Sequence, residues 1–274
     1  MSSRPQVLIL GGGFAGIGAA RKLKNADVDV TLVDAHDYHT FQPMLYQVAT
    51  GLVDNAVVAH PLRDLFHDMH NMHVRQATVE GIDREARQVT FADMQPLRYD
   101  YLVLALGARV NYFGVEGAAD HALPLYSLSD AIRMKEHVLE RWEAADRDPA
   151  LVEDGALNIV VVGGGATGVE SAGALAELYR GDFAKDYPSL PQDEARVILV
   201  EAGPQLFSMF KDDIREYTEK ALTERTVEVM VGEAVAADSG RLPLALAALL
   251  VAVVGVGVLA LPERRTAVVS PAAP

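Results

Sequence analysis

The 274-residue sequence contains no cysteine. This absence excludes disulfide bonds, iron–sulfur clusters, Cys-ligated zinc and a dithiol redox relay, so any redox chemistry has to come from a bound cofactor. Basic residues are also scarce: 24 Lys and Arg stand against 38 Asp and Glu, which gives a formal net charge of −14. An acidic surface disfavours the phosphate backbone of DNA or RNA, so we expect no nucleic-acid partner.

Short apolar runs rich in β-branched residues alternate along the chain with longer stretches of helical periodicity. This alternation is typical of an α/β fold with parallel sheets, and the length allows one large or two ordinary domains. We expect strands at Gln6–Leu10, Val28–Val33, Tyr101–Leu106, Asn158–Val162 and Arg196–Val200. The periodicity predicts helices at Gly13–Leu23, Ser129–Ala145, Gly165–Leu178 and Asp212–Arg225.

The long central helix has two candidate N-caps, Ser127 and Ser129. Ser127 has Asp130 three residues further on, which is the spacing of a capping box. After this helix, the acidic and turn-rich segment Ala144–Gly155 is our predicted junction between domains. We therefore predict one domain over residues 1–150, a second over residues 151–240, and a separate apolar tail over residues 241–274.

One sequence design occurs twice. QVLILGGGFAGIGAARKL at residues 6–23 and IVVVGGGATGVESAGAL at residues 159–175 both contain a strand, a G-x-G-x-x-G loop and a helix. The loop pattern alone is a weak signal, but here each copy is also followed by a second strand that ends in an acid. Each copy is therefore predicted to be a dinucleotide-binding unit of a Rossmann-like domain.

In the first copy, each glycine has a separate expected role. Gly11 allows a tight turn, Gly13 lets the backbone approach a pyrophosphate, and Gly16 lets the helix pack closely on the strand. The phosphates are expected at the positive N-terminus of the helix. Asp34 ends the next strand, where a carboxylate accepts hydrogen bonds from a ribose hydroxyl.

The second copy repeats these roles with Gly163, Gly165, Gly168 and the acid Glu201. The spacing to the acid is longer than usual, and we attribute the excess to an insertion over Tyr179–Ala195. A carboxylate at Glu201 repels a 2′-phosphate, so NADH is predicted to bind better than NADPH. The alternative is that the loops are tight turns without a ligand and that both acids are solvated.

Two dinucleotide sites on one chain indicate two dinucleotides. The simplest interpretation is one tightly held FAD and one exchanging NADH, with hydride passing between them. Four of the histidines, His60, His67, His70 and His73, lie close together in the sequence, but their spacing matches no familiar zinc motif. We therefore predict no metal site.

Several stretches carry a family resemblance. They are YHTFQPMLYQVATG at residues 38–51, HPL at 60–62, YDYLVLALGARVNYFGVEG at 99–117, GGGATGVE at 163–170 and VILVEAGPQLF at 197–207. In this order and spacing they resemble the type II NADH dehydrogenases, which are single-chain, non-proton-pumping NADH:quinone oxidoreductases of the two-dinucleotide-binding-domain flavoprotein superfamily. The resemblance covers about residues 5–235.

The resemblance implies a set of FAD-binding positions in this chain. They are Gly11, Gly12, Gly13, Phe14, Ala15, Gly16, Asp34, Ala35, His39, Val79, Ala105 and Gly107. It also implies that Glu170, in ATGVE, lies close to the nicotinamide and the quinone and takes part in proton handling or substrate binding. Quinone reduction takes up two protons, so a carboxylate there is chemically sensible. The alternative for Glu170 is a first-turn glutamate favoured by the helix dipole.

From the same resemblance we expect a quinone partner, either menaquinone or ubiquinone, membrane association on the cytoplasmic side, and a homodimer. The predicted reaction passes a hydride from NADH to FAD and electrons on to the quinone. One alternative is a soluble NADH-dependent flavin reductase with another acceptor. The other is a truncated, inactive module that binds dinucleotides without turnover.

The resemblance stops before the C-terminus, where the family has a second FAD motif and a membrane-binding segment, so the chain is expected to be C-terminally truncated. In their place, Leu242–Leu261 is a run of 20 residues without a charge. As a helix it would be about 30 Å long, which matches a membrane core and makes it a candidate transmembrane segment. Two alternatives are a frameshifted or truncated gene product and an in-frame stretch in which Ala252–Ala260 forms a buried strand and turn.

Overall fold

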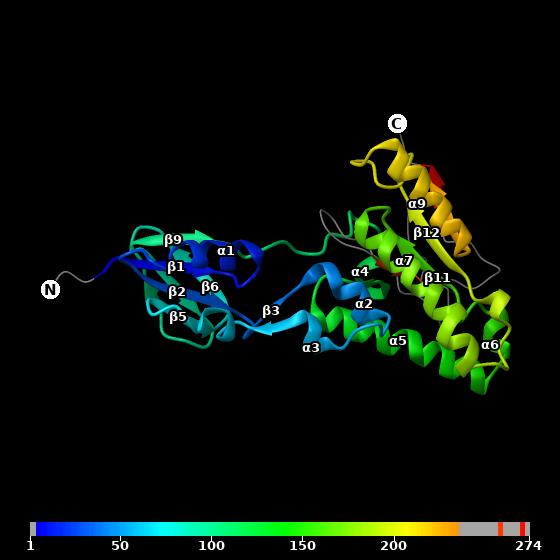
Figure 1. Ribbon diagram of the computed structural model, residues 1–274, viewed down its shortest axis with the longest axis horizontal. Helices are drawn as coiled ribbons and strands as arrows, with labels where there is room; N and C mark the ends of the chain where they lie inside the picture. The colour runs from blue at the N-terminus through cyan, green and yellow to red at the C-terminus, as the bar shows by residue number, and fades with distance from the viewer. Residues whose placement is uncertain (1–3, 236–256, 260–268, 272–274) are drawn as a thin grey trace. The chain divides into compact units, whose positions relative to one another are not determined.

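The computed structural model describes residues 4–235, 257–259 and 269–271. Its contacts divide the chain into two compact units (Figure 1). The first comprises Met1–Phe41 with Ala56–Ala108, and the second comprises Gln42–Asn55 with Arg109–Pro274. The predicted domain ranges 1–150, 151–240 and 241–274 are divisions by cofactor. Compactness does not test such divisions, so these ranges stay a prediction.

A four-stranded parallel sheet forms the centre of the first unit, with the strand order β5-β2-β1-β9. Its strands are β1 (Gln6–Leu10), β2 (Asp29–Asp34), β5 (Met72–Gln76) and β9 (Tyr101–Leu104). Alternate residues of β1 face opposite sides, so Val7 and Ile9 belong to one core cluster, and Leu8 and Leu10 belong to another. Both faces of the sheet are therefore covered, as the unbroken apolar run of β1 predicts.

Helix α1 (Phe14–Lys22) covers one face of this sheet through Ile17 and Ala20. The other face packs on an antiparallel sheet of β6 (Val79–Asp83), β7 (Gln88–Phe91) and β8 (Leu97–Arg98). The unit also contains a hairpin of β3 (Tyr38–Thr40) and β4 (Ala59–Pro61), followed by the short helix η2 (Asp64–Phe66). Strands β1 and β2 are parallel neighbours, so their carboxyl ends lie at the same edge of the sheet. Gly11 follows β1 and Asp34 is the last residue of β2, so both residues lie at this edge.

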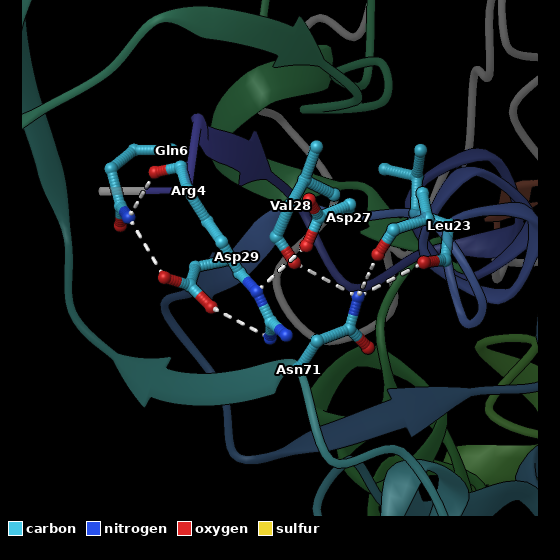
Figure 2. Close-up of polar contacts among 8 residues, drawn as sticks. Arg4, Gln6, Leu23, Asp27, Val28, Asp29 and Asn71 are labelled. Atoms are coloured by element: carbon cyan, nitrogen blue, oxygen red, sulfur yellow. Dashed lines mark hydrogen bonds and ion pairs between the residues drawn. The ribbon is translucent and has the colours of Figure 1, made fainter. Parts of the chain in front are cut away.

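At the opposite edge, the amino ends of the strands are tied together by polar contacts around the buried Asn71 (Figure 2). The side-chain amide nitrogen of Asn71 donates to the carbonyl oxygens of Leu23 and Val28, each at 3.0 Å. These two carbonyls flank the turn between α1 and β2. At the start of β1, the side-chain amide nitrogen of Gln6 donates to the carboxylate of Asp29 at 3.1 Å. The polar cluster therefore fixes the turn that leads from the glycine helix into the acid-bearing strand.

A five-stranded sheet forms the centre of the second unit, with the order β10-β15-β11-β12-β13. Three strands are parallel: β11 (Ile159–Val162), β12 (Val197–Glu201) and β13 (Val227–Val231). Strand β15 (Gly257–Leu259) runs antiparallel to β11 and pairs on its other side with β10 (Leu123–Pro124). Strands β14 (Glu233–Val235) and β16 (Val269–Pro271) form a separate antiparallel pair.

The helices of the second unit alternate with its parallel strands. Helix α7 (Ala166–Leu178) follows β11 and contacts β12, and α9 (Asp212–Glu224) follows β12 and contacts β13. The long α5 (Leu128–Arg147) packs on the short α2 (Leu45–Ala49). The chain's other helical segments are α3 (Asn55–Val58), α4 (Ala118–His121), α6 (Ala150–Glu153), α8 (Ala184–Asp186), η1 (Gln42–Met44), η3 (Tyr179–Phe183) and η4 (Gln192–Glu194).

The predicted α/β fold is confirmed, and each of the five predicted strands and four predicted helices is present with ends shifted by no more than two residues. Of the two candidate caps, Ser127 is the N-cap of α5, in a capping box with Asp130. The stretch Ala144–Gly155, which we predict to be the domain junction, holds the last turn of α5 and the helix α6. The long insertion at 179–195 is also largely helical, since α7 continues through η3 into α8.

Among the residues that the structure describes, no helix is both long enough and apolar enough to cross a lipid bilayer. The predicted transmembrane segment 242–261 lies outside the described residues except at Gly257–Leu259. Those three residues form β15 in place of a membrane-spanning helix. A strand at this point is what the buried-strand alternative for residues 252–260 predicts.

Candidate functional site

The first glycine loop connects β1 to α1, and two of its glycines are required by backbone packing. Gly11 has φ +109°, and a Cβ there would overlap the carbonyl oxygen of Ala105, just after β9. A Cβ on Gly16 would overlap the carbonyl oxygen of Gly11. The start of α1 therefore lies directly against the turn that ends β1, as predicted for a close helix–strand contact.

Gly13 differs from these two glycines because no contact within the described part of the chain requires it. It is the N-cap of α1 with an ordinary extended backbone (φ −78°), and apart from its chain neighbours no described atom lies within 4 Å of the Cβ it lacks. No side chain caps this helix end. The free space lies at the positive end of the helix dipole, which is where a pyrophosphate approaches the backbone of such a loop. These residues therefore fit a dinucleotide.

Asp34, at the end of β2, is tied to the loop by its carboxylate. One oxygen accepts the backbone N–H of Gly12 at 2.6 Å, and the other accepts that of His36 at 2.8 Å. The side chain is only 21% exposed, so these charge-assisted bonds hold it firmly. Each carboxylate oxygen still has a lone pair for a ribose hydroxyl.

The second loop, between β11 and α7, has the same geometry. Gly163 has φ +112°, and a Cβ on Gly168 would overlap the carbonyl oxygen of Gly163. Gly165 is the N-cap of α7, again with nothing within 4 Å of its missing Cβ. Glu201 accepts the backbone N–H of Gly164 at 2.5 Å and that of Gly203 at 2.6 Å. The second loop therefore fits a dinucleotide on the same grounds as the first.

Sequence reasoning missed three contributors to these loops. Gly164 corresponds to Gly12, and the identical GGG letters of the two copies could have revealed it. A fully buried leucine lies under each middle glycine, Leu62 in the first unit and Leu206 in the second. A Cβ on Gly12 would come within 2.7 Å of Leu62, and one on Gly164 within 2.6 Å of Leu206. Both leucines lie in stretches that carry the family resemblance, HPL and VILVEAGPQLF, but no local spacing relates them to the glycines, because they come from unrelated segments.

The other residues implied for FAD all belong to the first unit. Phe14 begins α1, and its ring packs edge-on against His39 with centroids 4.8 Å apart. Ala15 follows it on the exposed side of the helix, and Ala35 follows Asp34 after β2. Ala105 contacts the loop as described, and Gly107 lies two residues further on with φ +76°. Val79 packs on the core cluster of the face opposite α1, away from these contacts.

Glu170 lies on α7 of the second unit, in the second turn of the helix. No acidic residue occupies the first turn, so the alternative of a first-turn glutamate favoured by the dipole is wrong. Glu170 is exposed, but neighbouring atoms partly desolvate its carboxyl group, and this desolvation raises its pKa above the ordinary value. Desolvation therefore holds Glu170 closer to its protonated form than a fully solvated glutamate, which suits a group that gives or takes a proton.

Two strand–glycine–helix units of one design, each followed by a strand that ends in a carboxylate, define an α/β protein with two loops of the dinucleotide-binding type. The chain belongs to the pyridine nucleotide-disulphide oxidoreductase family, whose sequence model matches residues 5–259. The match includes the residues of β15. Because none of the 274 residues is a cysteine, the thiol chemistry in the family's name does not occur in this chain.

Similar proteins narrow this family. The chain is 36% identical over 241 residues to the type II NADH:quinone oxidoreductase NdhA of Mycobacterium tuberculosis, covering 86% of this chain and 51% of that protein. It is 35% identical over 234 residues to Ndh of the same organism, covering 84% and 50%. The chain thus spans about half the length of the curated relatives it matches.

Among solved structures, NDH2 of Plasmodium falciparum in complex with NADH has a TM-score of 0.79 to this chain at 23% identity. The alignment covers 86% of this chain and 49% of that chain. A sulfide:quinone oxidoreductase of Aquifex aeolicus gives a TM-score of 0.68 at 22% identity, covering 86% and 52%. At these identities the likeness shows that the fold is shared.

The glycines of each loop are expected to respond differently to the same substitution. Gly11→Ala and Gly16→Ala should lower the free energy of unfolding by at least about 3 kcal/mol, because the new Cβ overlaps backbone. Gly13→Ala should cost at most about 1 kcal/mol, mainly because alanine is a poorer N-cap than glycine. Denaturant unfolding of the cofactor-free protein measures all three. A loss at Gly13 as large as at Gly11 would show that the fold itself needs this glycine.

The raised pKa of Glu170 predicts the sign of a pH effect on stability. The native state binds this proton more tightly than the unfolded chain, so the contribution of Glu170 to stability is lost as the pH rises above the ordinary glutamate range. Glu170→Gln removes this loss. Its free energy of unfolding relative to wild type should therefore increase between pH 4 and pH 7. The exposed Glu216 of α9 supplies the control, Glu216→Gln, and an equal trend in both variants would exclude desolvation of Glu170 as the cause.

Proposed function

We propose that this chain carries the two dinucleotide sites of a type II NADH:quinone oxidoreductase, with FAD on the first glycine loop and NADH on the second. When bound, FAD accepts a hydride from NADH and passes two electrons to a quinone. The observation that carries the proposal is the pair of helix N-termini at which Gly13 and Gly165 leave room for a pyrophosphate. The names of the curated relatives supply the reaction.

The assignment of one cofactor to each loop is supported by how the implied residues divide between the two units. All positions that the resemblance implies for FAD lie in the first unit, from the loop at Gly11 to Gly107. Those implied for NADH, together with Glu170, lie in the second. Each unit thus contains one loop, one anchored acid and one set of implied contacts.

The proposed preference for NADH rests on Glu201. Two backbone amides hold its carboxylate at the end of β12, so the side chain cannot turn away without breaking both bonds. A 2′-phosphate placed on this ribose position would meet the negative charge directly, whereas a 2′-hydroxyl can donate to it.

We assign Glu170 to proton handling beside the nicotinamide and the quinone. Its raised pKa supports this role, since quinone reduction needs protons as well as electrons. The proposal extends to menaquinone or ubiquinone as acceptor, to membrane association on the cytoplasmic side, and to a homodimer.

The proposed reaction is tested by adding one equivalent of NADH to the FAD-loaded protein under anaerobic conditions. We expect the oxidised-flavin absorption to disappear. In Gly165→Ala the methyl group occupies space over the N-terminus of α7, so the same bleaching should need about tenfold more NADH or more. Gly173→Ala is the control, because it adds a methyl group inside α7 at an ordinary 3.9 Å contact with Leu222. Flavin that binds but stays oxidised would favour the inactive module.

The role of Glu201 predicts a change in nucleotide preference. Titration of the cofactor-free chain with NADH and NADPH, followed by nucleotide fluorescence, should show tighter binding of NADH. Glu201→Gln should narrow the ratio of the two dissociation constants by about tenfold or more, because the repelling charge is removed.

The matched control for this experiment is Asp34→Asn, which neutralises the equivalent acid of the first loop. It should leave the NADH:NADPH ratio unchanged. An unchanged ratio in Glu201→Gln, or an equal change in both variants, would remove Glu201 from nucleotide recognition.

A further inference from the structure

The carbonyl group of the middle glycine is fixed in both loops, but by donors of different kinds. In the first loop, Nδ1 of His39 lies 3.0 Å from the carbonyl oxygen of Gly12. A carbonyl oxygen can only accept, so Nδ1 carries the proton. In the second loop, the carbonyl oxygen of Gly164 accepts the backbone N–H of Phe207 at 2.9 Å. In each loop, one N–H group therefore donates to the carbonyl oxygen of the middle glycine. The donor is the His39 side chain in the first loop and the Phe207 backbone in the second.

The direction of this carbonyl determines the direction of the next amide. The peptide between Gly12 and Gly13 is trans, so its C=O and its N–H point in opposite directions. The N–H of Gly12 is already bound to Asp34. Once His39 also holds the carbonyl of Gly12, the N–H of Gly13 has one orientation left. Gly13 is the N-cap of α1, so its N–H lies where the pyrophosphate is expected.

In the second loop, the donor residue has an unusual backbone. Phe207 makes its hydrogen bond from a left-handed conformation, with φ +48°, which L-residues seldom adopt. The preceding residue, Leu206, is the leucine that lies under Gly164. Two consecutive residues thus supply both supports of the second loop.

In the first unit, the β3–β4 hairpin provides the same two supports. His39 is on β3 and pairs with His60 of β4, and Leu62 follows β4 and lies under Gly12. His39 is itself buried, with the ring of Phe14 against its own ring at 87°. The imidazole of His39 is therefore held in place to donate this hydrogen bond. In the first loop the donor is a side chain, so a substitution can remove it.

We infer that His39 is a positioning residue of the first loop: its Nδ1–H holds the carbonyl of Gly12 so that the N–H of Gly13 is presented to the cofactor phosphate. The consequence for FAD rests on the proposed function, in which this loop binds FAD. The consequence for the loop itself does not, because both partners of this hydrogen bond belong to the protein.

The test compares His39→Asn with His39→Leu in the full chain. The side chains of Asn and Leu have nearly the same size and shape, and both remove the imidazole ring. Only Asn keeps a donor, because its Nδ2 is as many bonds from Cα as Nδ1 of His. Hydrogen exchange of the peptide covering residues 11–17 reports on the loop without cofactor, and equilibrium dialysis measures FAD binding. NADH titration of the second loop is the internal control.

We expect His39→Leu to raise amide exchange in this peptide and the dissociation constant of FAD by about tenfold each, which is the typical effect of one lost hydrogen bond. His39→Asn should stay within about threefold of wild type in both measurements, and NADH binding should not change in either variant. If His39→Leu does not give folded protein, His39→Ala compared with His39→Asn provides the same test.

Equal exchange in the Asn and Leu variants would overturn the inference, whatever their FAD affinities. Equal FAD affinities despite different exchange would also overturn it, because the held carbonyl would then not serve the cofactor. The third outcome is that the wild-type protein binds no FAD while the Asn and Leu variants still differ in amide exchange. This result would refute the proposed function and leave the positioning of the loop by His39 supported.

Discussion

The interaction on which each glycine loop depends is the hydrogen bond from its middle glycine to the carboxylate that ends the neighbouring strand. It joins Gly12 to Asp34 in the first unit and Gly164 to Glu201 in the second. A carboxylate with two backbone donors is held far more firmly than a solvated loop acid. The bond therefore fixes the direction of the carboxylate and, at the same time, fixes the loop that precedes the helix.

For the proposed function, anchoring the loop in this way allows an acidic chain to hold a phosphate. The protein has a formal charge of −14, and the loop sequences GGGFAG and GGGATG contain no Lys or Arg. In the proposed complex, the attraction comes from oriented backbone amides and the positive end of a helix dipole, not from cationic side chains. Such dipoles act only when they are fixed in direction. This is why the contacts behind the loops, from Leu62, Leu206, His39 and Phe207, matter as much as the residues that face the ligand.

The parts of the fold and site that depend on local spacing could be predicted from the sequence. The strand at residues 6–10, the glycines at 11, 13 and 16 and the acid at 34 follow rules that act over a few residues or one strand–helix–strand unit. The supports behind the loops could not be predicted, because Leu62 and Leu206 meet equivalent glycines from unrelated segments. Helix α5 runs to Arg147, two residues beyond its predicted end at Ala145, into a stretch whose acids and proline indicated a turn. The strand at 257–259 was one of three sequence-based alternatives for the apolar tail, because the choice among them depends on pairing with β11, which no local pattern encodes.

The central claim is that the two loops are two separate dinucleotide sites on one chain. Equilibrium dialysis of the wild-type protein with FAD and NADH together, under anaerobic conditions, tests it most directly. The account predicts one FAD and one NADH per chain, with neither displacing the other. One dinucleotide in total, or NADH that displaces FAD one for one, would contradict it.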